Sequence, residues 1–145
     1  MLRWSLDAIR TQLRAVAPQI PIYLKSAASG FEQPSFYLRL VEGTYEETHR
    51  TNYMMQAVWE IVYMPLEDEA GQADPFNLLD MADRLHQHFM ALPSLPGAGK
   101  VSFDRTALRG QMRQGDFVLQ ITLEMELEGP QEAYDVMQDI VMNEQ

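Results

Sequence analysis

The histidines have the widest choice of chemistry in this sequence, because an imidazole can transfer a proton or bind a metal ion. There are three of them, His49, His86 and His88. His86 and His88 are two positions apart in a segment with helical spacing, which turns their side chains about 200° away from each other. The two side chains therefore cannot hold one metal ion, and His49 is distant in the sequence. We predict three surface histidines and no metal site.

An acidic triplet and a glycine-rich run suggest two further kinds of site. Glu67-Asp68-Glu69 could bind Ca²⁺ or Mg²⁺, but it lacks the every-second-residue oxygen spacing of an EF-hand loop. Gly97-Ala98-Gly99-Lys100 resembles the end of a phosphate-binding loop, yet the upstream glycine is missing and Val101 stands where Ser or Thr is required. We predict a solvated acidic loop and a simple connector at these two places.

Nucleophiles and paired acids form no catalytic arrangement in the sequence. There is no cysteine, which removes thiolate nucleophiles, thiolate zinc sites and disulfides. No serine lies in a Gly-x-Ser-x-Gly elbow. Glu124 and Glu126 share one face of a predicted strand, as acids on a solvated sheet face commonly do. The sequence therefore predicts no catalytic residue, no cofactor and no enzyme activity.

The charge is strongly acidic and unevenly distributed. The chain has 145 residues, with 21 acids and 11 bases, and its formal net charge is −10. Residues 1–64 contain equal numbers of acids and bases, so the whole acidic excess lies after residue 64. Such a balance argues against DNA binding, which needs clustered Lys and Arg, and against an anionic membrane surface. No apolar run approaches the length of a membrane span, and the N-terminal residues lack the pattern of a signal peptide. We therefore expect a soluble cytoplasmic protein.

Hydrophobic periodicity predicts the elements. Asp74 followed by Pro75 marks a helix start, because an acid caps the first turn and proline suits its first position. The stretch 117–128 alternates almost without a break between apolar and polar residues. In chain order we expect a helix over 2–16, strands over 22–24, 35–42 and 46–64, a helix over 75–92, strands over 101–113 and 117–128, and a helix over 134–141. We expect the connections to be a turn at 42–45, an acidic loop over 66–74, a flexible connector at 96–99 and a turn at 114–116.

These elements predict a single α+β domain over residues 1–145. In the third strand the odd-numbered side chains are wholly apolar and the even-numbered ones are mixed, which is typical of a sheet covered on one side. The odd-numbered set is Met55, Ala57, Trp59, Ile61 and Tyr63. We therefore expect a mostly antiparallel sheet with helices packed on one face, in the order α-β-β-β-α-β-β-α.

Two blocks of the sequence resemble a known family. The first is Ile20-Pro21-Ile22-Tyr23 followed by the run from Gly30 to Leu38, Gly-Phe-Glu-Gln-Pro-Ser-Phe-Tyr-Leu. The second is Arg50 before a strand that ends in the run from Val58 to Pro65, Val-Trp-Glu-Ile-Val-Tyr-Met-Pro. Together with the element order, these blocks resemble the tail terminator family of tailed phages and prophages of Gram-positive bacteria.

The resemblance implies a structural virion assembly protein that is not an enzyme. Such a protein caps the phage tail tube, stops its polymerisation and joins the tube to the head connector. The implied partners are copies of itself in a ring, usually a hexamer on the tube, together with the tail tube protein and the head-tail connector protein. The implied location is the virion tail, after assembly in the cytoplasm of the bacterial host. The family has no catalytic residues to carry over. The prediction that neither DNA nor a membrane is a partner comes from the acidic charge.

Five residues are candidates for contacts with these partners: Tyr45, Arg50, Glu67, Asp68 and Glu69. Tyr45 is a large aromatic side chain in the predicted turn, and tyrosine is common at the centre of interfaces. Arg50 belongs to the blocks that carry the resemblance. The three acids lie in the loop over 66–74, which has little to bury and which we expect to be mobile in the free protein and ordered by a partner.

Two alternatives remain open from the sequence. A small-ligand-binding or enzymatic α+β domain would have a selective site in the cleft between the second helix and the sheet. Another head-tail joining protein of similar size would share the composition and the absence of a catalytic arrangement.

Overall fold

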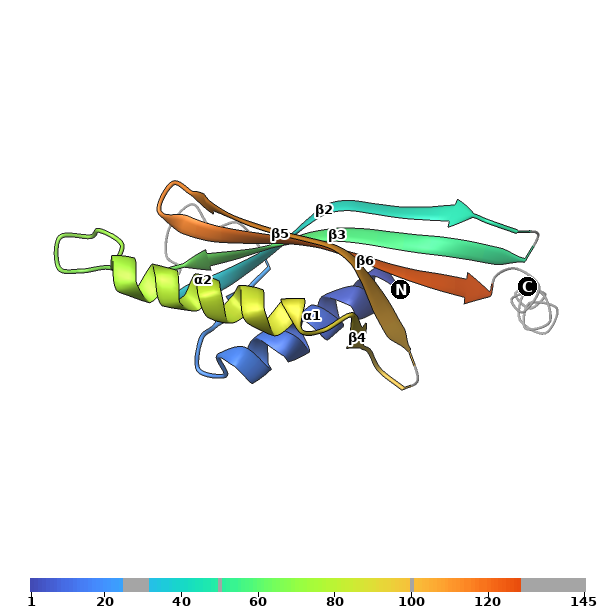
Figure 1. Ribbon diagram of the computed structural model, residues 1–145, viewed down its shortest axis with the longest axis horizontal. Coiled ribbons are helices and arrows are strands. Elements are labelled where there is room, and N and C mark those ends of the chain that lie inside the picture. The colour runs from blue at the N-terminus through green and yellow to red at the C-terminus, as the bar shows by residue number, and fades with distance from the viewer. Residues whose placement is uncertain (25–31, 50, 100, 129–145) are drawn as a thin grey trace.

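The computed structural model describes residues 1–24, 32–49, 51–99 and 101–128 (Figure 1). It confirms an α+β fold, with two helices on one side of a curled six-stranded sheet. The described elements follow the order α-β-β-β-α-β-β-β. Their bounds are α1 (Leu2–Val16), β1 (Ile22–Tyr23), β2 (Ser35–Glu47), β3 (Asn52–Met64), α2 (Pro75–Met90), β4 (Ser94–Pro96), β5 (Ser102–Arg113) and β6 (Asp116–Glu128).

The sheet has the strand order β1-β2-β3-β6-β5-β4. The short pair β1 and β2 is parallel, and every other neighbouring pair is antiparallel. Strand β3 is central, because β2 and β6 pair with it along nearly its whole length. β2, β3 and β6 extend beyond the helices as a long arm, which is plain in Figure 1.

The core lies between the sheet and the two helices. The predicted apolar face of β3 is buried, with Met55, Ala57, Ile61 and Tyr63 fully inaccessible and Trp59 nearly so. The alternating face of β6 and one stripe of each helix complete this core. Every second side chain of the strands is buried, and each helix buries one stripe of its surface. The sheet and the helices therefore pack as two layers around this core.

The second helix begins where its sequence predicts. The carboxylate of Asp74 accepts hydrogen bonds from the backbone N–H groups of Phe76, at 3.0 Å, and Asn77, at 3.3 Å. These bonds satisfy two of the amides that a helix start leaves without partners. The cap fixes the point at which the acidic segment 66–74 joins α2.

The predicted turn at 42–45 is wrong. Strand β2 continues to Glu47, and the reversal of the chain lies between Glu47 and Asn52, where the N–H of Thr48 donates to the carbonyl of Asn52. Gly43 lies inside β2, and a Cβ there would come within 3.1 Å of the Leu2 side chain. The glycine therefore permits the close approach of α1 to the strand, and it does not form a turn.

Three further expectations have different outcomes. The predicted connector at 96–99 is partly wrong, because Ser94–Pro96 forms β4 and its Leu95 is fully buried. The turn at 114–116 is confirmed in place, with positive φ angles at Gln114 and Gly115. The helix over 134–141 lies outside the described residues, as do Gly30 and Arg50.

Candidate interaction surfaces

The acidic segment forms a small hairpin at one end of the molecule (Figure 1). The carboxylate of Asp68 accepts hydrogen bonds from the backbone N–H groups of Ala70 and Gln72, both at 2.9 Å. Glu67 and Ala73 form a single β-bridge across the hairpin. The N–H of Leu66 donates to the side-chain oxygen of Asn77 at 3.0 Å, which ties the hairpin to α2. The expectation that this segment is mobile in the free protein and ordered by a partner stays a prediction.

Large apolar side chains are exposed beside this hairpin. Phe76, in the first turn of α2, is 77% exposed, and Leu66 and Leu79 are also exposed. Residues 66–83 contain six acids and no base. We call this surface the acidic knob and define it as Leu66, Glu67, Asp68, Glu69, Phe76 and Leu79. Exposed aromatic residues rimmed by charges are typical of interaction surfaces.

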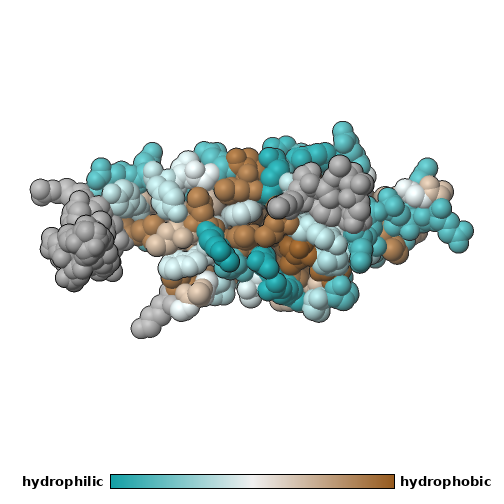
Figure 2. All heavy atoms as spheres, turned by 180° about the vertical axis from the view of Figure 1, so that it is seen from behind, coloured by the Kyte–Doolittle hydropathy of each residue, from teal (hydrophilic) through white to brown (hydrophobic). Residues whose placement is uncertain are grey.

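A second exposed surface lies where α1 meets β2. Leu2 of α1 packs against Gly43, and Leu40 contacts the same place. Leu40 and Val41 are exposed, and Tyr45 is 52% exposed on the side of the sheet that faces the helices. We call this surface the shoulder and define it as Leu2, Leu40, Val41 and Tyr45. Seen from behind, apolar side chains gather in the middle of the molecule with hydrophilic ones between them (Figure 2).

The outer edge of β2 lies beside the shoulder and lacks a strand partner along most of its length. Among the described residues, β1 pairs only with Phe36 and Tyr37, so β2 from Arg39 to Glu47 pairs on one side alone. An open edge of this kind presents backbone donors and acceptors to a partner chain. Together with the exposed side chains, this edge makes the shoulder a candidate contact surface.

The open face of the sheet carries an arginine cluster. Both Nε and Nη2 of Arg39 donate to Oε1 of Glu60, at 3.2 and 2.9 Å, and Nη2 of Arg113 donates to Oε2 at 3.0 Å. The Glu60 side chain is only 6% exposed, whereas the two arginines are about half exposed. Burial alone would raise the pKa of Glu60, but the hydrogen bonds and charges of Arg113 and Arg39 outweigh it and lower that pKa.

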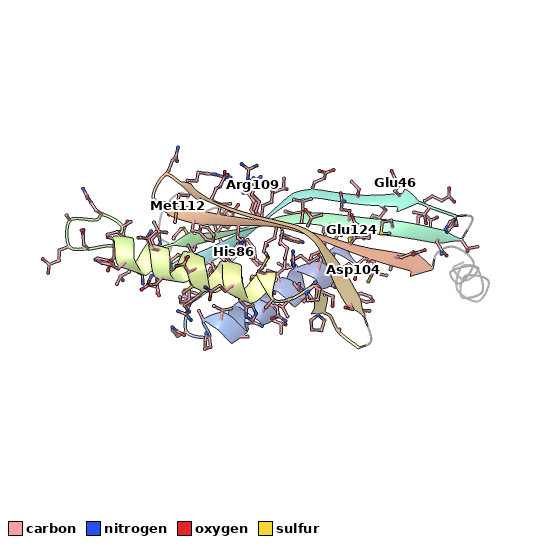
Figure 3. The ribbon with its side chains drawn as sticks, viewed as in Figure 1. Glu46, His86, Asp104, Arg109, Met112 and Glu124 are labelled. Atoms are coloured by element: carbon pink, nitrogen blue, oxygen red, sulfur yellow. The ribbon has the colours of Figure 1, made fainter. Side chains whose placement is uncertain are left out.

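Arg109 joins this cluster from β5. It lines a hollow of about 150 Å³ with Glu60, Arg113 and polar neighbours, on the side of the sheet opposite α2 (Figure 3). The arm of the sheet carries acids on the same open face, including Glu46 and Glu124, which Figure 3 labels. The open face is thus basic over its centre and acidic along the arm.

A cavity of about 300 Å³ lies beside Tyr63 of β3, between α2 and the segments 19–21 and 32–34, near the cleft where a small-ligand site would be expected. The hydroxyl of Tyr63 donates to Asn77 at 2.6 Å in its wall, and burial raises the pKa of this tyrosine. Arg84 also lines the cavity and donates to the backbone carbonyl of Val16. Tyr63, Asn77 and Arg84 in this wall are thus already bonded within the chain.

The structure separates the candidate interface residues into two groups. Glu67, Asp68 and Glu69 lie together on the acidic knob, whereas Tyr45 belongs to β2, whose arm extends toward the other end of the molecule (Figure 1). Arg50 lies outside the described residues. No group of three or more acids or histidines in the described part of the chain lies close enough to hold a metal ion. His88 shares a hydrogen bond with Gln12 at 2.7 Å, and burial lowers its pKa.

Sequence reasoning missed the arginine cluster. One signal was available, because Glu60 is the only charged residue in the apolar run from Met55 to Met64. An acid at such a place needs partners when it is buried. Its partners are Arg39 of β2 and Arg113 of β5. Because β6 lies between β3 and β5, the bond to Arg113 depends on the register of three strands, which the sequence alone does not give.

A family model described as phage tail terminator protein matches residues 6–135, which is most of the chain. No curated protein matches the sequence. Neither described helix is long and apolar enough to span a lipid bilayer.

Proposed function

Because this chain belongs to the phage tail terminator family, we propose that it caps the tail tube, stops tube polymerisation and joins the tube to the head connector. Membership of the family indicates a structural role in the phage tail and an association with other virion proteins. The match over residues 6–135 is the observation that carries the proposal. Its location would be the virion tail, after assembly in the host cytoplasm.

The proposed assembly is a ring, with six copies when it is docked on the tube. Its partners would be copies of itself, the tail tube protein and the head-tail connector protein. The presence of two different exposed surfaces on one small domain supports contacts with more than one neighbour. A ring requires two distinct patches on each copy, related by a rotation that closes.

We propose further that the protein does not bind duplex DNA and that acids from residues 65–128 line the channel of the ring. Six copies at −10 each would carry 6 × −10 = −60 in formal charge. Binding to a duplex needs Lys and Arg contacts that release counterions from the phosphates. A repulsive wall suits a conduit through which DNA must pass without sticking.

The proposed role needs no catalysis, and we propose that the protein is not an enzyme. A small-ligand-binding or enzymatic domain remains the competing hypothesis, and its site would be the cavity beside Tyr63 and Asn77. Selective binding of a metabolite there, together with tails that assemble normally without the chain, would favour that hypothesis.

The test uses purified tail tube protein that polymerises in solution. Adding the purified chain well below the concentration of tube protein should stop growth and leave an extra density at one end of each tube in electron micrographs. Equal amounts of an unrelated acidic protein serve as the control. Tubes that grow to the same length with and without the chain would refute a capping role.

A further inference from the structure

We propose that the hollow in the arginine cluster binds one carboxylate group, and that Glu69 of the next copy around the ring supplies it. The arginine cluster is defined as Arg39, Arg109 and Arg113. This inference rests on the proposed ring, and it names the side chains that would meet there. It joins two different surfaces, the acidic knob of one copy and the open sheet face of its neighbour.

The first argument is the set of unused donors in the cluster. Both oxygens of Glu60 are occupied, because Oε1 accepts from Nε and Nη2 of Arg39 and Oε2 accepts from Nη2 of Arg113. Each guanidinium has several N–H groups, so both arginines keep donors that Glu60 does not use. Arg109 is exposed and makes no hydrogen bond or ion pair with any residue that the structure describes. The cluster therefore has the donors for a second carboxylate.

Other acids of the open face do not neutralise the cluster. Glu42 and Asp116 lie close by in the register of the strands, but within the described ranges neither forms an ion pair with an arginine. Burial and the charge of Glu67 raise the pKa of Asp116, which is the direction expected of an acid without a close cation. Three arginines and the buried Glu60 thus leave the cluster with a formal charge of +2.

The second argument is the hollow itself. It has a volume of about 150 Å³, and its lining includes Arg109, Arg113 and the amide side chains of Gln111 and Gln120. Arginine binds carboxylates well, because two parallel N–H groups match the two oxygens. A neighbour can reach the hollow from the side, since among the described strands β5 pairs with β6 alone from Ala107 onward. The hollow thus offers several donors to an acidic side chain of another subunit.

The surroundings of the hollow favour a single carboxylate over a long polyanion. The arm carries acids on the same open face, among them Glu46 and Glu124 (Figure 3). A nucleic acid bound at the cluster would extend across these acids and be repelled, whereas one side chain would not. A carboxylate of a protein is therefore the class of ligand that the charges favour.

The acidic knob presents such a carboxylate. Glu69 is exposed, and in the part of the chain that the structure describes it makes no hydrogen bond or ion pair. The preceding acid, Asp68, is instead bonded to the backbone of the hairpin, and residues 66–83 contain no base. Phe76 of the same knob is 77% exposed, so one contact would pair the acid and cover the aromatic ring. An unpaired acid and an unpaired arginine in one chain favour contact between copies.

The contact forms between copies because the two surfaces face different ways in one chain. The N–H of Leu66 donates to Asn77 and ties the hairpin to α2, whereas the hollow lies on the side of the sheet opposite α2. The hairpin projects from one end of the molecule, where a neighbour can receive it (Figure 1). Contact between two different patches is heterologous and closes into a ring when the rotation permits.

The experiment uses cysteine pairs, because the natural chain has no cysteine and every thiol is therefore introduced. The test variant carries Glu69→Cys and Gln111→Cys, both at exposed positions. Tails assembled in the host with this variant are treated with a short bismaleimide and separated on a denaturing gel. Each single variant and the pair Glu69→Cys with Thr44→Cys are the controls, since Thr44 is exposed on the open face of the arm.

We expect the test pair to give covalent oligomers larger than a dimer and the controls to give about fivefold less, because adjacent thiols react at a high effective concentration. Several other results would overturn the proposal: equal products from both pairs, products no larger than a dimer, dimers from the Glu69→Cys variant alone, or a product that joins the knob to another virion protein. Tails of normal length that contain none of the chain would instead overturn the proposed function itself.

A charge exchange keeps the test decisive if the cysteine pair does not assemble. Glu69→Arg or Arg109→Glu alone should lower the number of capped tails by about tenfold, and the two together should recover most of that loss. Arg109→Gln, which adds no acid beside Glu60, should also lower the number. Glu46→Arg, on the open face of the arm, is the matched control and should leave assembly nearly unchanged. Losses that simply multiply in the double variant would refute contact between Glu69 and the hollow.

Discussion

The buried carboxylate of Glu60 gives the sharpest prediction about the fold. Replacing it by glutamine keeps its size and removes its charge from between Arg39 and Arg113. Glutamine has one acceptor oxygen in place of two, and its amide NH₂ group would face the guanidinium of one arginine, so at least one of the three hydrogen bonds, at 2.9 to 3.2 Å, is lost. We expect Glu60→Gln to fold and to be less stable than the natural protein.

The size of the loss follows from these contacts. Hydrogen bonds to a charged group contribute about 1.5–3 kcal/mol each, and neutral ones about 0.5–1.5 kcal/mol. Both arginines are about half exposed, so water screens part of the difference. The free energy of unfolding should therefore fall by about 1–3 kcal/mol in total, of the order of a single charged hydrogen bond. For a chain of this length, that lowers Tm by roughly 3–10 °C.

The pH dependence checks that the charge is the cause. The pKa of Glu60 is lowered in the folded protein, so its contribution to stability is present above the unfolded-state pKa and is lost as the pH falls through the folded-state pKa. Urea unfolding should thus show a constant gap between the natural protein and Glu60→Gln from pH 7 to about pH 5. The gap should begin to narrow near the unfolded-state pKa, about 4.3, and go on narrowing as the pH falls through the lower folded-state pKa.

Glu124→Gln is the matched control, because Glu124 lies on the same open face, is less buried and accepts a hydrogen bond from the Gln56 amide at 2.7 Å. It should change the free energy of unfolding by less than about 0.5 kcal/mol. Equal stabilities of Glu60→Gln and the natural protein at pH 7 would refute the reasoning. So would a gap that stayed the same at pH 3.

Three further substitutions test individual packing features by urea unfolding. Ser5→Ala removes the buried acceptor of the Trp59 indole N–H, bonded at 2.8 Å, and should cost about 1–3 kcal/mol; an unchanged midpoint would show that the indole finds another partner. Asp74→Ala removes the cap of α2 and should cost about 1 kcal/mol, with a loss under about 0.3 kcal/mol contradicting the cap. Gly110→Val places a Cβ at 2.7 Å from the Phe117 ring and should cost about 1–3 kcal/mol, whereas full stability would mean that the ring moves freely.

Strong periodicity made much of the fold predictable. The alternating faces of β3 and β6 are buried as expected, and the cap at Asp74 opens α2. The errors arose where a glycine or a proline, both common in turns, lies inside a strand. Gly43 was interpreted as a turn residue, but it admits the Leu2 side chain against the middle of β2. Pro96 was interpreted as the start of a connector because of its composition, but it ends β4, in which Leu95 is buried and pairs with Phe103.

The surfaces were less predictable than the core. The acids at 67–69 were identified, but the exposed Phe76 beside them was not, because an aromatic residue in a helix is expected to lie in the core. The bond between Glu60 and Arg113 joins strands that are far apart in the sequence. Such contacts depend on the register of three strands, and short-range patterns contain no information about it.

The length of the tails tests the central claim most directly. The gene for this chain would be deleted in the phage or prophage that encodes it, and tail lengths would be measured by electron microscopy with and without the chain supplied from a plasmid. The proposed role predicts tubes of variable, excessive length without joined heads in the deletion, and uniform tails with heads when the chain is restored. Tails of normal length joined to heads in the deletion would contradict the account.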